Sequence, residues 1–300
     1  MSDAAPELIF DGHQDLAEGP VWRDGCLWWV NITAGELHRL NPDTGFHEHR
    51  CIGGSAGCAA PGADGRWLVA CDCELRWLDW ASGAMTPFCA VEPDKSQNRF
   101  NDGQCDSRGR LWIGTMDKQA AGAVGALYVV EAGHKSRRVL DHLTISNGMA
   151  WSLDDRTFYF TDTATNRVDL FDFDPDTGVI SNRRALAIFA PEEFPDGMTL
   201  DAEDNLWVAL WGAAAVVCLD GQTGRELRRI RVPVSQPSSC TFGGPQLDEL
   251  FITTARVGLS AAALEREPHA GGIFRVRPGM CGRPARSFNP RVAADCFQKI

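Results

Sequence analysis

The chain has 300 residues, of which 44% are hydrophobic and 23% charged, values typical of a globular protein with a substantial buried core. Its 40 acidic residues outnumber the 29 basic ones, the formal net charge is −11, and no basic stripe is present, which argues against nucleic acid as a partner. No stretch has the length of a membrane span, and residues 1–10 lack the basic and apolar regions of a signal peptide, so we expect a cytoplasmic protein without a membrane partner.

One pattern of hairpins recurs along the chain. Each unit has an Asp/Gly turn, an apolar strand, a short turn, a second apolar strand and a Thr-Gly or Ser-Gly turn. The units cover residues 24–45, 64–83, 107–130, 154–178, 203–224 and 247–279, with insertions in the third and the sixth. Equivalent positions recur roughly every 40–48 residues, the period of propeller blades, at Trp28, Leu68, Trp112, Tyr159, Trp207 and Phe251.

Six units of about four strands predict an all-β fold, a six-bladed β-propeller of four-stranded antiparallel blades that forms a single domain over residues 1–300. A β-sandwich does not repeat at this period, and the coils of a β-helix are shorter. No amphipathic helix of useful length is expected. Most of the tryptophans occupy equivalent strand positions and should pack between blades, whereas Trp211 follows a strand and is a candidate to approach a pocket.

A polar residue next to a glycine precedes most of the reference positions by ten to twelve residues. The elements are "LAEGPVW" (16–22), "FNDGQCD" (100–106), "ISNGMAW" (145–151) and "FPDGMTL" (194–200), and Gly57 and Ser239 have the same phase in the weaker units. These positions should open the innermost strand of each blade, which lines the central channel. The glycine should allow a tight turn and a close backbone approach. The alternative is that each polar residue caps an ordinary strand-entry turn.

Three of these polar residues, Glu18, Asn147 and Asp196, provide oxygen ligands that converge at one end of the channel. Such ligands suit one divalent cation, Ca²⁺, Mg²⁺ or Mn²⁺, with Zn²⁺ and Fe²⁺ as alternatives. Two carboxylates and one amide leave coordination positions for water and substrate. The sequence therefore predicts a metal site that is open to a ligand.

Over roughly residues 16–276 the chain resembles the gluconolactonase/regucalcin (senescence marker protein) family. The resemblance rests on the elements above and on "NRFNDGQCDSRGRLWIGTM", "FPDGMTLDAEDNLWVALWG" and "FGGPQLDELFITTAR". It implies a six-bladed propeller that binds a divalent cation and hydrolyses a sugar lactone. The implied metal ligands are Glu18, Asn147 and Asp196, and the implied substrate-binding residues are Arg99, Asn101 and Asp102.

One loop departs from the animal branch of that family. The segment "GTMDKQAAGAVGALY" is shorter, and Asp117 and Lys118 are its only charged residues. In this respect the chain resembles bacterial aldonolactonases that act on arabinose, xylose or glucose lactones. The substrate preference of the animal proteins therefore does not transfer to this chain.

The predicted site suits lactone hydrolysis. A channel cation would polarise the carbonyl, and Asp196 would accept a proton from the attacking water as general base. Arg99 and Asn101 would hydrogen-bond the sugar hydroxyls. Asp102 would contact substrate or hold Arg99 in place, and we favour the second role. The alternatives are a non-enzymatic calcium-binding regulator or interaction scaffold, and a phosphotriesterase-like lactonase with two calcium ions.

Four other patterns are given structural interpretations. "GGSAG" (53–57) matches a nucleophile elbow but leads into a strand, so Ser55 is not expected to be a nucleophile. "DFDPDTG" (172–178) lacks the spacing of an EF-hand and predicts a hairpin turn. His47 and His49 alternate on an outer strand and are expected to form a solvated edge. The 11 cysteines are scattered and predict reduced thiols, and Cys71 with Cys73 does not predict a zinc site.

Overall fold

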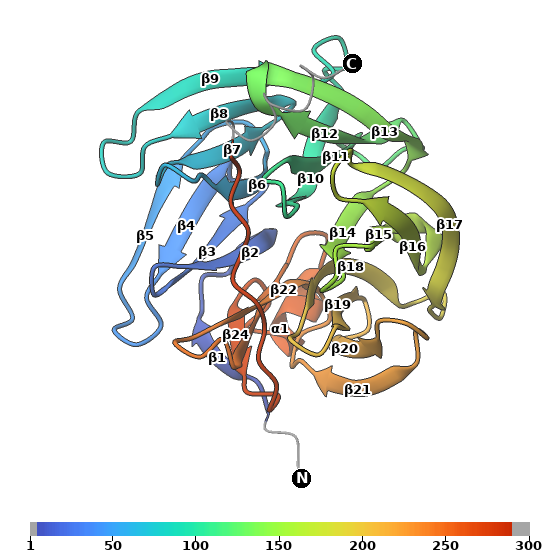
Figure 1. Ribbon diagram of the computed structural model, residues 1–300. Coiled ribbons are helices and arrows are strands. Elements are labelled where there is room, and N and C mark those ends of the chain that lie inside the picture. Colours follow the sequence, from blue (N-terminus) through green and yellow to red (C-terminus); the bar gives the residue numbers. More distant parts are fainter. Residues whose placement is uncertain (1–4, 290–300) are drawn as a thin grey trace.

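In the computed structural model, which describes residues 5–289, six four-stranded antiparallel sheets are arranged as a ring around a common axis (Figure 1). Each sheet is one blade. In five of the six blades the strands follow their sequence order from the centre of the ring outward, so the first strand in sequence is the innermost. The predicted six-bladed β-propeller is confirmed. No helix among the described residues has the length and apolar character needed to cross a membrane.

The blades follow one another along the chain. The first three consist of β2 (Ala17–Arg23), β3 (Cys26–Asn31), β4 (Glu36–Leu40) and β5 (His47–Cys51); β6 (Ala56–Pro61), β7 (Trp67–Cys71), β8 (Glu74–Leu78) and β9 (Met85–Ala90); and β10 (Asn98–Cys105), β11 (Leu111–Asp117), β12 (Gly125–Glu131) and β13 (Lys135–Leu143). The next two consist of β14 (Ser146–Trp151), β15 (Thr157–Asp162), β16 (Arg167–Asp174) and β17 (Val179–Ile188); and β18 (Phe194–Leu200), β19 (Asn205–Trp211), β20 (Ala215–Asp220) and β21 (Glu226–Arg231). Short 3₁₀ turns, η1 (Ala132–His134) and η2 (Thr163–Thr165), lie between strands.

The sixth blade closes the ring with strands from both parts of the chain. Its order is β22 (Pro237–Gly243), β23 (Glu249–Thr254), β24 (Ile273–Val276) and β1 (Glu7–Phe10). The early strand β1 pairs antiparallel with β24, and Leu8 lies opposite Phe274. This pairing covers an edge that β24 would otherwise expose. The sequence repeat did not predict this closure, because β1 precedes the first unit.

Apolar side chains from neighbouring blades fill the spaces between the sheets. All six reference residues lie on the second strand of their blade, and Trp112, Trp207 and Phe251 are fully buried. Trp207 of the fifth blade packs in one cluster with Cys240 and Phe242 of the sixth. The tryptophans at these positions are therefore inter-blade core, as predicted.

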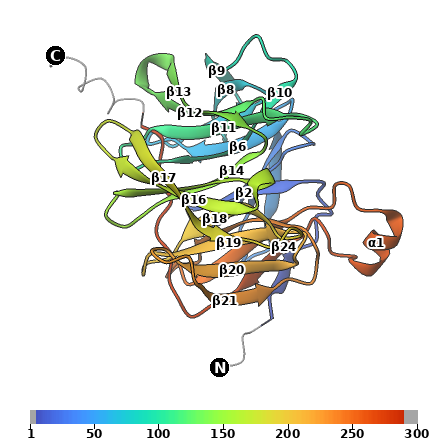
Figure 2. The same cartoon turned by 90° about the vertical axis from the view of Figure 1, so that its right-hand side faces the viewer.

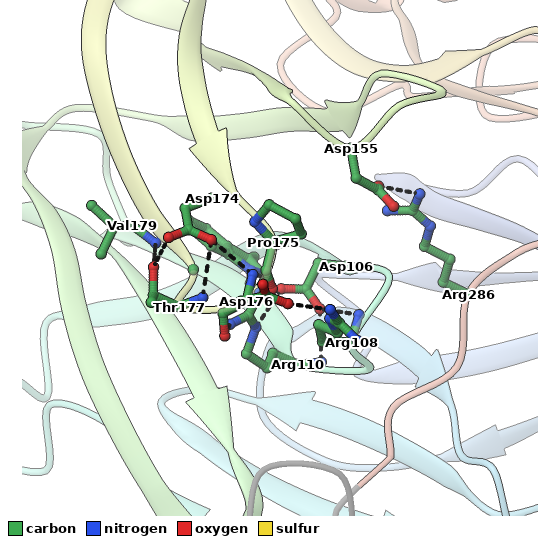
Figure 3. Close-up of polar contacts among 12 residues, drawn as sticks. Asp106, Arg108, Arg110, Asp155, Asp174, Pro175, Asp176, Thr177, Val179 and Arg286 are labelled. Atoms are coloured by element: carbon green, nitrogen blue, oxygen red, sulfur yellow. Dashed lines mark hydrogen bonds and ion pairs between the residues drawn. The ribbon is translucent and has the colours of Figure 1, made fainter. Parts of the chain in front are cut away.

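Turns of neighbouring blades also contact each other through polar groups (Figure 3). Arg110 donates to Asp106 Oδ2 at 2.6 Å and to the carbonyl oxygen of Pro175 at 2.7 Å, which joins the β10–β11 turn to the β16–β17 turn. In the second turn, Asp174 Oδ1 accepts from the backbone N–H of Asp176 at 2.9 Å. "DFDPDTG" is thus a hairpin turn, as predicted.

One short helix was not predicted. The helix α1 (Ala261–Arg266) lies in the connection between β23 and β24 and projects away from the ring (Figure 2). Ser260 caps it, since its hydroxyl accepts from the backbone N–H of Ala263 at 3.2 Å. Its six residues are too few to give a recognisable helical period.

Candidate metal and substrate site

Each innermost strand carries an irregularity at the predicted polar position. Pairing with the second strand is interrupted between Glu18 and Val21, between Ser146 and Met149, and between Pro195 and Met198. The other three inner strands are interrupted at the same phase. The polar-glycine elements are therefore β-bulges within strands, not the tight turns before strands that we expected. A bulge re-aims one side chain, and here it does so once per blade.

The glycines of these bulges allow the inner strands to approach one another closely. A Cβ atom on Gly148 would overlap the carbonyl oxygen of Asp196, and one on Gly197 would overlap the hydroxyl of Ser239. A Cβ atom on Gly103 would lie 2.9 Å from the sulfur of Cys58. The predicted close approach is thus present at Gly103, Gly148 and Gly197, where only glycine fits, whereas Gly19 has space for a Cβ atom.

The three predicted metal ligands come from three blades and are all buried. Their exposed fractions are 5% for Glu18, 3% for Asn147 and 5% for Asp196. Asn147 is held by Thr163, because its Nδ2 donates to the Thr163 hydroxyl at 3.1 Å, and that hydroxyl donates to the Pro195 carbonyl oxygen at 2.8 Å. This leaves Asn147 Oδ1 and Asp196 Oδ1 buried without a hydrogen-bond partner.

A third carboxylate belongs to the same cluster. Asp102 is 5% exposed, its Oδ1 accepts from the backbone N–H of Gly103 at 2.7 Å, and its Oδ2 has no partner. Arg99 donates instead to the Phe100 carbonyl oxygen and to Asn101, so our preferred role for Asp102, holding Arg99, is wrong. The Asp102 carboxylate is held instead by the backbone N–H of its own bulge.

Burial dominates the electrostatics of this cluster. Burial, and then the Asp102 carboxylate, raise the pKa of Glu18 to about 8. Burial, followed by Glu18 and Asp102, raises the pKa of Asp196 well above its ordinary value. Burial also raises the pKa of Asp102 to about 6. Three carboxyl groups therefore share a poorly solvated space in which Arg99 is the nearby cation that acts on both Glu18 and Asp196.

These residues fit a hard divalent cation. The unpartnered oxygens of Asn147, Asp196 and Asp102 are acceptors only, and no protein donor satisfies them within residues 5–289. An ion with two positive charges would offset the repulsion among the carboxylates and fill the vacant acceptor positions. The donor set is all oxygen, which favours calcium, magnesium or manganese over softer metals.

Arg99 and Asn101 are placed together beside this cluster. Arg99 Nη1 donates to Asn101 Oδ1 at 2.7 Å, and Asn101 Nδ2 donates to the Ser146 carbonyl oxygen at 2.9 Å. Both polar atoms of Asn101 thus have protein partners, whereas Nε and Nη2 of Arg99 have none among the described residues. Burial lowers the pKa of Arg99 to about 10, which still leaves it charged at neutral pH.

A cavity of about 320 Å³ lies at the other end of the inner strands. It is lined by their C-terminal residues and by Arg283 and Arg286 of the last described segment. Arg286 is fixed there by Asp155 at 2.6 Å (Figure 3). Asp102 reaches this cavity, but Glu18, Asn147 and Asp196 do not line it. The three predicted metal ligands therefore lie outside this cavity, and Asp102 is the residue of their cluster that lines it.

The charged residues of the shortened loop have structural partners. Asp117 Oδ1 accepts from the backbone N–H of Gln119 at 2.8 Å, and Lys118 pairs with Asp72 at 3.1 Å. Trp211 is half-buried and pairs across the sheet with Phe194, two residues before Asp196. Its approach to a pocket stays a prediction.

Two further predictions are confirmed and one is revised. Ser55 lies in the connection between β5 and β6, without the helix of a nucleophile elbow, and the ten cysteines of residues 5–289 are all free. The histidines do not form a simple solvated edge. His38 is buried, and its Nδ1 lies 3.0 Å from His47 Nε2; of the three histidines on this hairpin, only His49 is exposed. The cross-strand register brings these rings together, which sequence spacing on one strand did not show.

Thr163 was missed by the sequence analysis. It orients Asn147 and links β14 to β18 through the Pro195 carbonyl oxygen, yet it lies in a short 3₁₀ turn after the second strand of its blade. No repeat phase marks that position. The signal that identifies it is a hydrogen-bond network, which appears only in three dimensions.

The fold and the buried acidic channel define a propeller with a polar centre shared among blades. Residues 16–256 match the SMP-30/gluconolactonase/LRE-like family, and the chain belongs to that family. It is 36% identical to regucalcin from Oryctolagus cuniculus over 297 residues, which cover 96% of this chain and 99% of the relative.

Solved structures agree with this assignment. The calcium-binding protein regucalcin from Agrobacterium tumefaciens superposes with a TM-score of 0.90 at 31% identity, over 95% of this chain and 97% of that one. A luciferin-regenerating enzyme superposes with a TM-score of 0.89 at 30% identity, over 95% of this chain and all of the other. The similarity therefore extends over nearly the whole propeller.

Proposed function

We propose that the protein is a metal-dependent lactonase that opens a sugar lactone to the aldonic acid. The observation that carries this proposal is the buried cluster of Glu18, Asn147 and Asp196, in which Asn147 Oδ1 and Asp196 Oδ1 lack protein donors. A purely structural channel has no use for such a cluster, since each buried and unpartnered polar atom costs free energy. Membership of the SMP-30/gluconolactonase/LRE-like family supports the same activity.

Glu18, Asn147 and Asp196 would hold one divalent cation, and calcium agrees with the description of the Agrobacterium tumefaciens relative as a calcium-binding protein. When bound, such a cation polarises the lactone carbonyl and lowers the pKa of a nearby water. Because opposite charge favours ionisation, a bound cation would hold Glu18 and Asp196 as carboxylates, against the burial that raises the pKa of both.

In the proposed reaction, Asp196 accepts a proton from water as the water oxygen attacks the lactone carbonyl carbon. The ring C–O bond then breaks, and the leaving alkoxide takes the proton held by Asp196 to become a hydroxyl group, which returns Asp196 to the carboxylate form. Arg99 would bind the sugar hydroxyls through Nε and Nη2, which have no described protein partner. Asn101 would position Arg99, because its own polar atoms are already engaged.

The test is hydrolysis of a panel of aldono-1,4- and 1,5-lactones by metal-stripped protein reloaded with one cation at a time. We expect activity with at least one lactone and one cation, and we expect Asp196→Ala to abolish it with the fold intact. Asp94→Ala, an exposed acidic residue, is the matched control and should remain fully active. Full activity of Asp196→Ala would overturn the proposed mechanism.

A calcium-binding protein without catalytic activity is the second candidate, favoured by the description of the Agrobacterium tumefaciens relative as calcium-binding. It makes a different prediction in the same experiment. Calcium would bind in the channel and stabilise the protein, yet no lactone of the panel would be opened with any cation. That combination of results would replace the lactonase proposal with a binding function.

A further inference from the structure

A second group of ligand-type side chains lies on the outer hairpin of the first blade, far along its sheet from the channel. In the β4–β5 pairing, Glu36 lies opposite Cys51 and His38 lies opposite His49. Directly opposed residues project from the same face of a sheet. The register therefore brings a carboxylate, a thiol and an imidazole to one exposed face.

The distances among these groups suit a metal ion. His49 Nε2 lies 3.5 Å from Glu36 Oε1, and one ligand atom each from Glu36, His49 and Cys51 lies within 4.8 Å of the others. Ligands about 2.0–2.3 Å from a tetrahedral zinc ion are separated by about 3.3–3.8 Å. The Cys51 thiol would have to move by only about 1 Å to bring its sulfur within the ligand–ligand separation of a tetrahedral zinc site.

His38 fixes the carboxylate of this cluster from the protein interior. Its Nε2 lies 3.0 Å from Glu36 Oε2, and its ring is buried and stacked on Trp29 with a centroid separation of 5.1 Å. The two oxygens of Glu36 are thus divided, one toward His38 and the other toward His49. Metal-binding side chains are commonly oriented in this way by a buried partner.

We propose that Glu36, His49 and Cys51 bind one borderline transition-metal ion of the Zn²⁺ class, with water at the remaining position. A thiolate and an imidazole select such metals, whereas the all-oxygen channel cluster selects hard cations. The chain then has two chemically different metal sites. The surface site would link the two outermost strands of the first blade. It lies near the contact between the first and sixth blades, where the ring centroids of Phe10 on β1 and His47 on β5 are 4.4 Å apart.

The test uses Co²⁺ and Zn²⁺ with full-length protein under a non-chelating reductant. Co²⁺ should give a thiolate-to-metal charge-transfer band that saturates at one equivalent, and Zn²⁺ should displace it. Cys51→Ser should abolish the band and lower Zn²⁺ affinity at least about tenfold. Cys281→Ser is the matched control, because Cys281 is also an exposed free cysteine, and it should change neither.

Four further variants complete the test. Glu36→Gln and His49→Ala should weaken Zn²⁺ binding, whereas His142→Ala, an exposed histidine on β13, should not. Asp196→Ala should leave the charge-transfer band intact, which separates this site from the channel. The proposal is overturned if the wild-type protein gives no band, or if the band persists in Cys51→Ser.

Discussion

Raising the pH should destabilise the metal-free protein, because its folded state keeps channel carboxyl groups protonated that the unfolded state ionises. Glu18 has an ordinary pKa of 4.5, and in the folded protein burial and the Asp102 carboxylate raise it to about 8. Between these two values the folded state binds more protons than the unfolded state. The free energy of unfolding is therefore highest below pH 4.5 for this group and falls until the pH passes 8.

The expected slope is large enough to measure. One group that is protonated only in the folded state lowers the free energy of unfolding by up to about 1.4 kcal/mol per pH unit. Asp102, with its pKa raised by burial from 3.8 to about 6, adds to the slope in the lower part of the range. Over three pH units the loss reaches several kcal/mol, a large share of the roughly 5–15 kcal/mol that stabilises a typical domain.

The assay is urea unfolding with a strong chelator present, followed by tryptophan fluorescence at several pH values. Glu18→Gln removes one titrating group and should reduce the slope, whereas Glu265→Gln on the exposed face of α1 should leave it unchanged. Added calcium should stabilise the wild-type protein more as the pH rises, because protons and the cation compete for the same oxygens. A flat profile for the metal-free wild-type protein, or an equal slope in Glu18→Gln, would refute the reasoning.

Two other predictions concern the inner strands. Gly197→Ala should lower the free energy of unfolding by about 1–3 kcal/mol in the same urea assay, because its methyl group would overlap Ser239. Gly122→Ala, with open space around it, should be close to neutral. Equal stability of the two variants would contradict the packing argument. Arg99→Lys should raise KM for the lactone at least about tenfold, since an ammonium group cannot reproduce two guanidinium donors at fixed angles. Arg108→Lys on the exposed β10–β11 turn is the control and should leave KM unchanged. An unchanged KM in Arg99→Lys would show that Arg99 does not bind the substrate.

The repeat period was sufficient to predict the architecture. Trp112, Trp207 and Phe251 occupy equivalent second-strand positions because each fills the same space between neighbouring blades. The phase of Glu18 and Asp196 relative to these residues placed both on inner strands. Positions that are buried in the same way in every blade thus leave a regular pattern in the sequence, and that pattern was enough to predict the fold.

Features that depend on the details of strand pairing left no such pattern. The four residues of β1 join the last blade, and nothing in "ELIF" identifies β24 as its partner. The role of Asp102 depended on the direction in which a bulge turns its carboxylate. The cluster of Glu36, His49 and Cys51 follows from the β4–β5 register, which the length of the connecting turn sets.

The most direct test of the proposed channel site is anomalous diffraction from crystals soaked in Mn²⁺. The account predicts an anomalous peak in the central channel, in contact with the side-chain oxygens of Glu18, Asn147 and Asp196. The peak should disappear in crystals of Asp196→Ala that retain the propeller fold. A channel without a peak, or one in which Mn²⁺ contacts none of these three residues, would contradict the account.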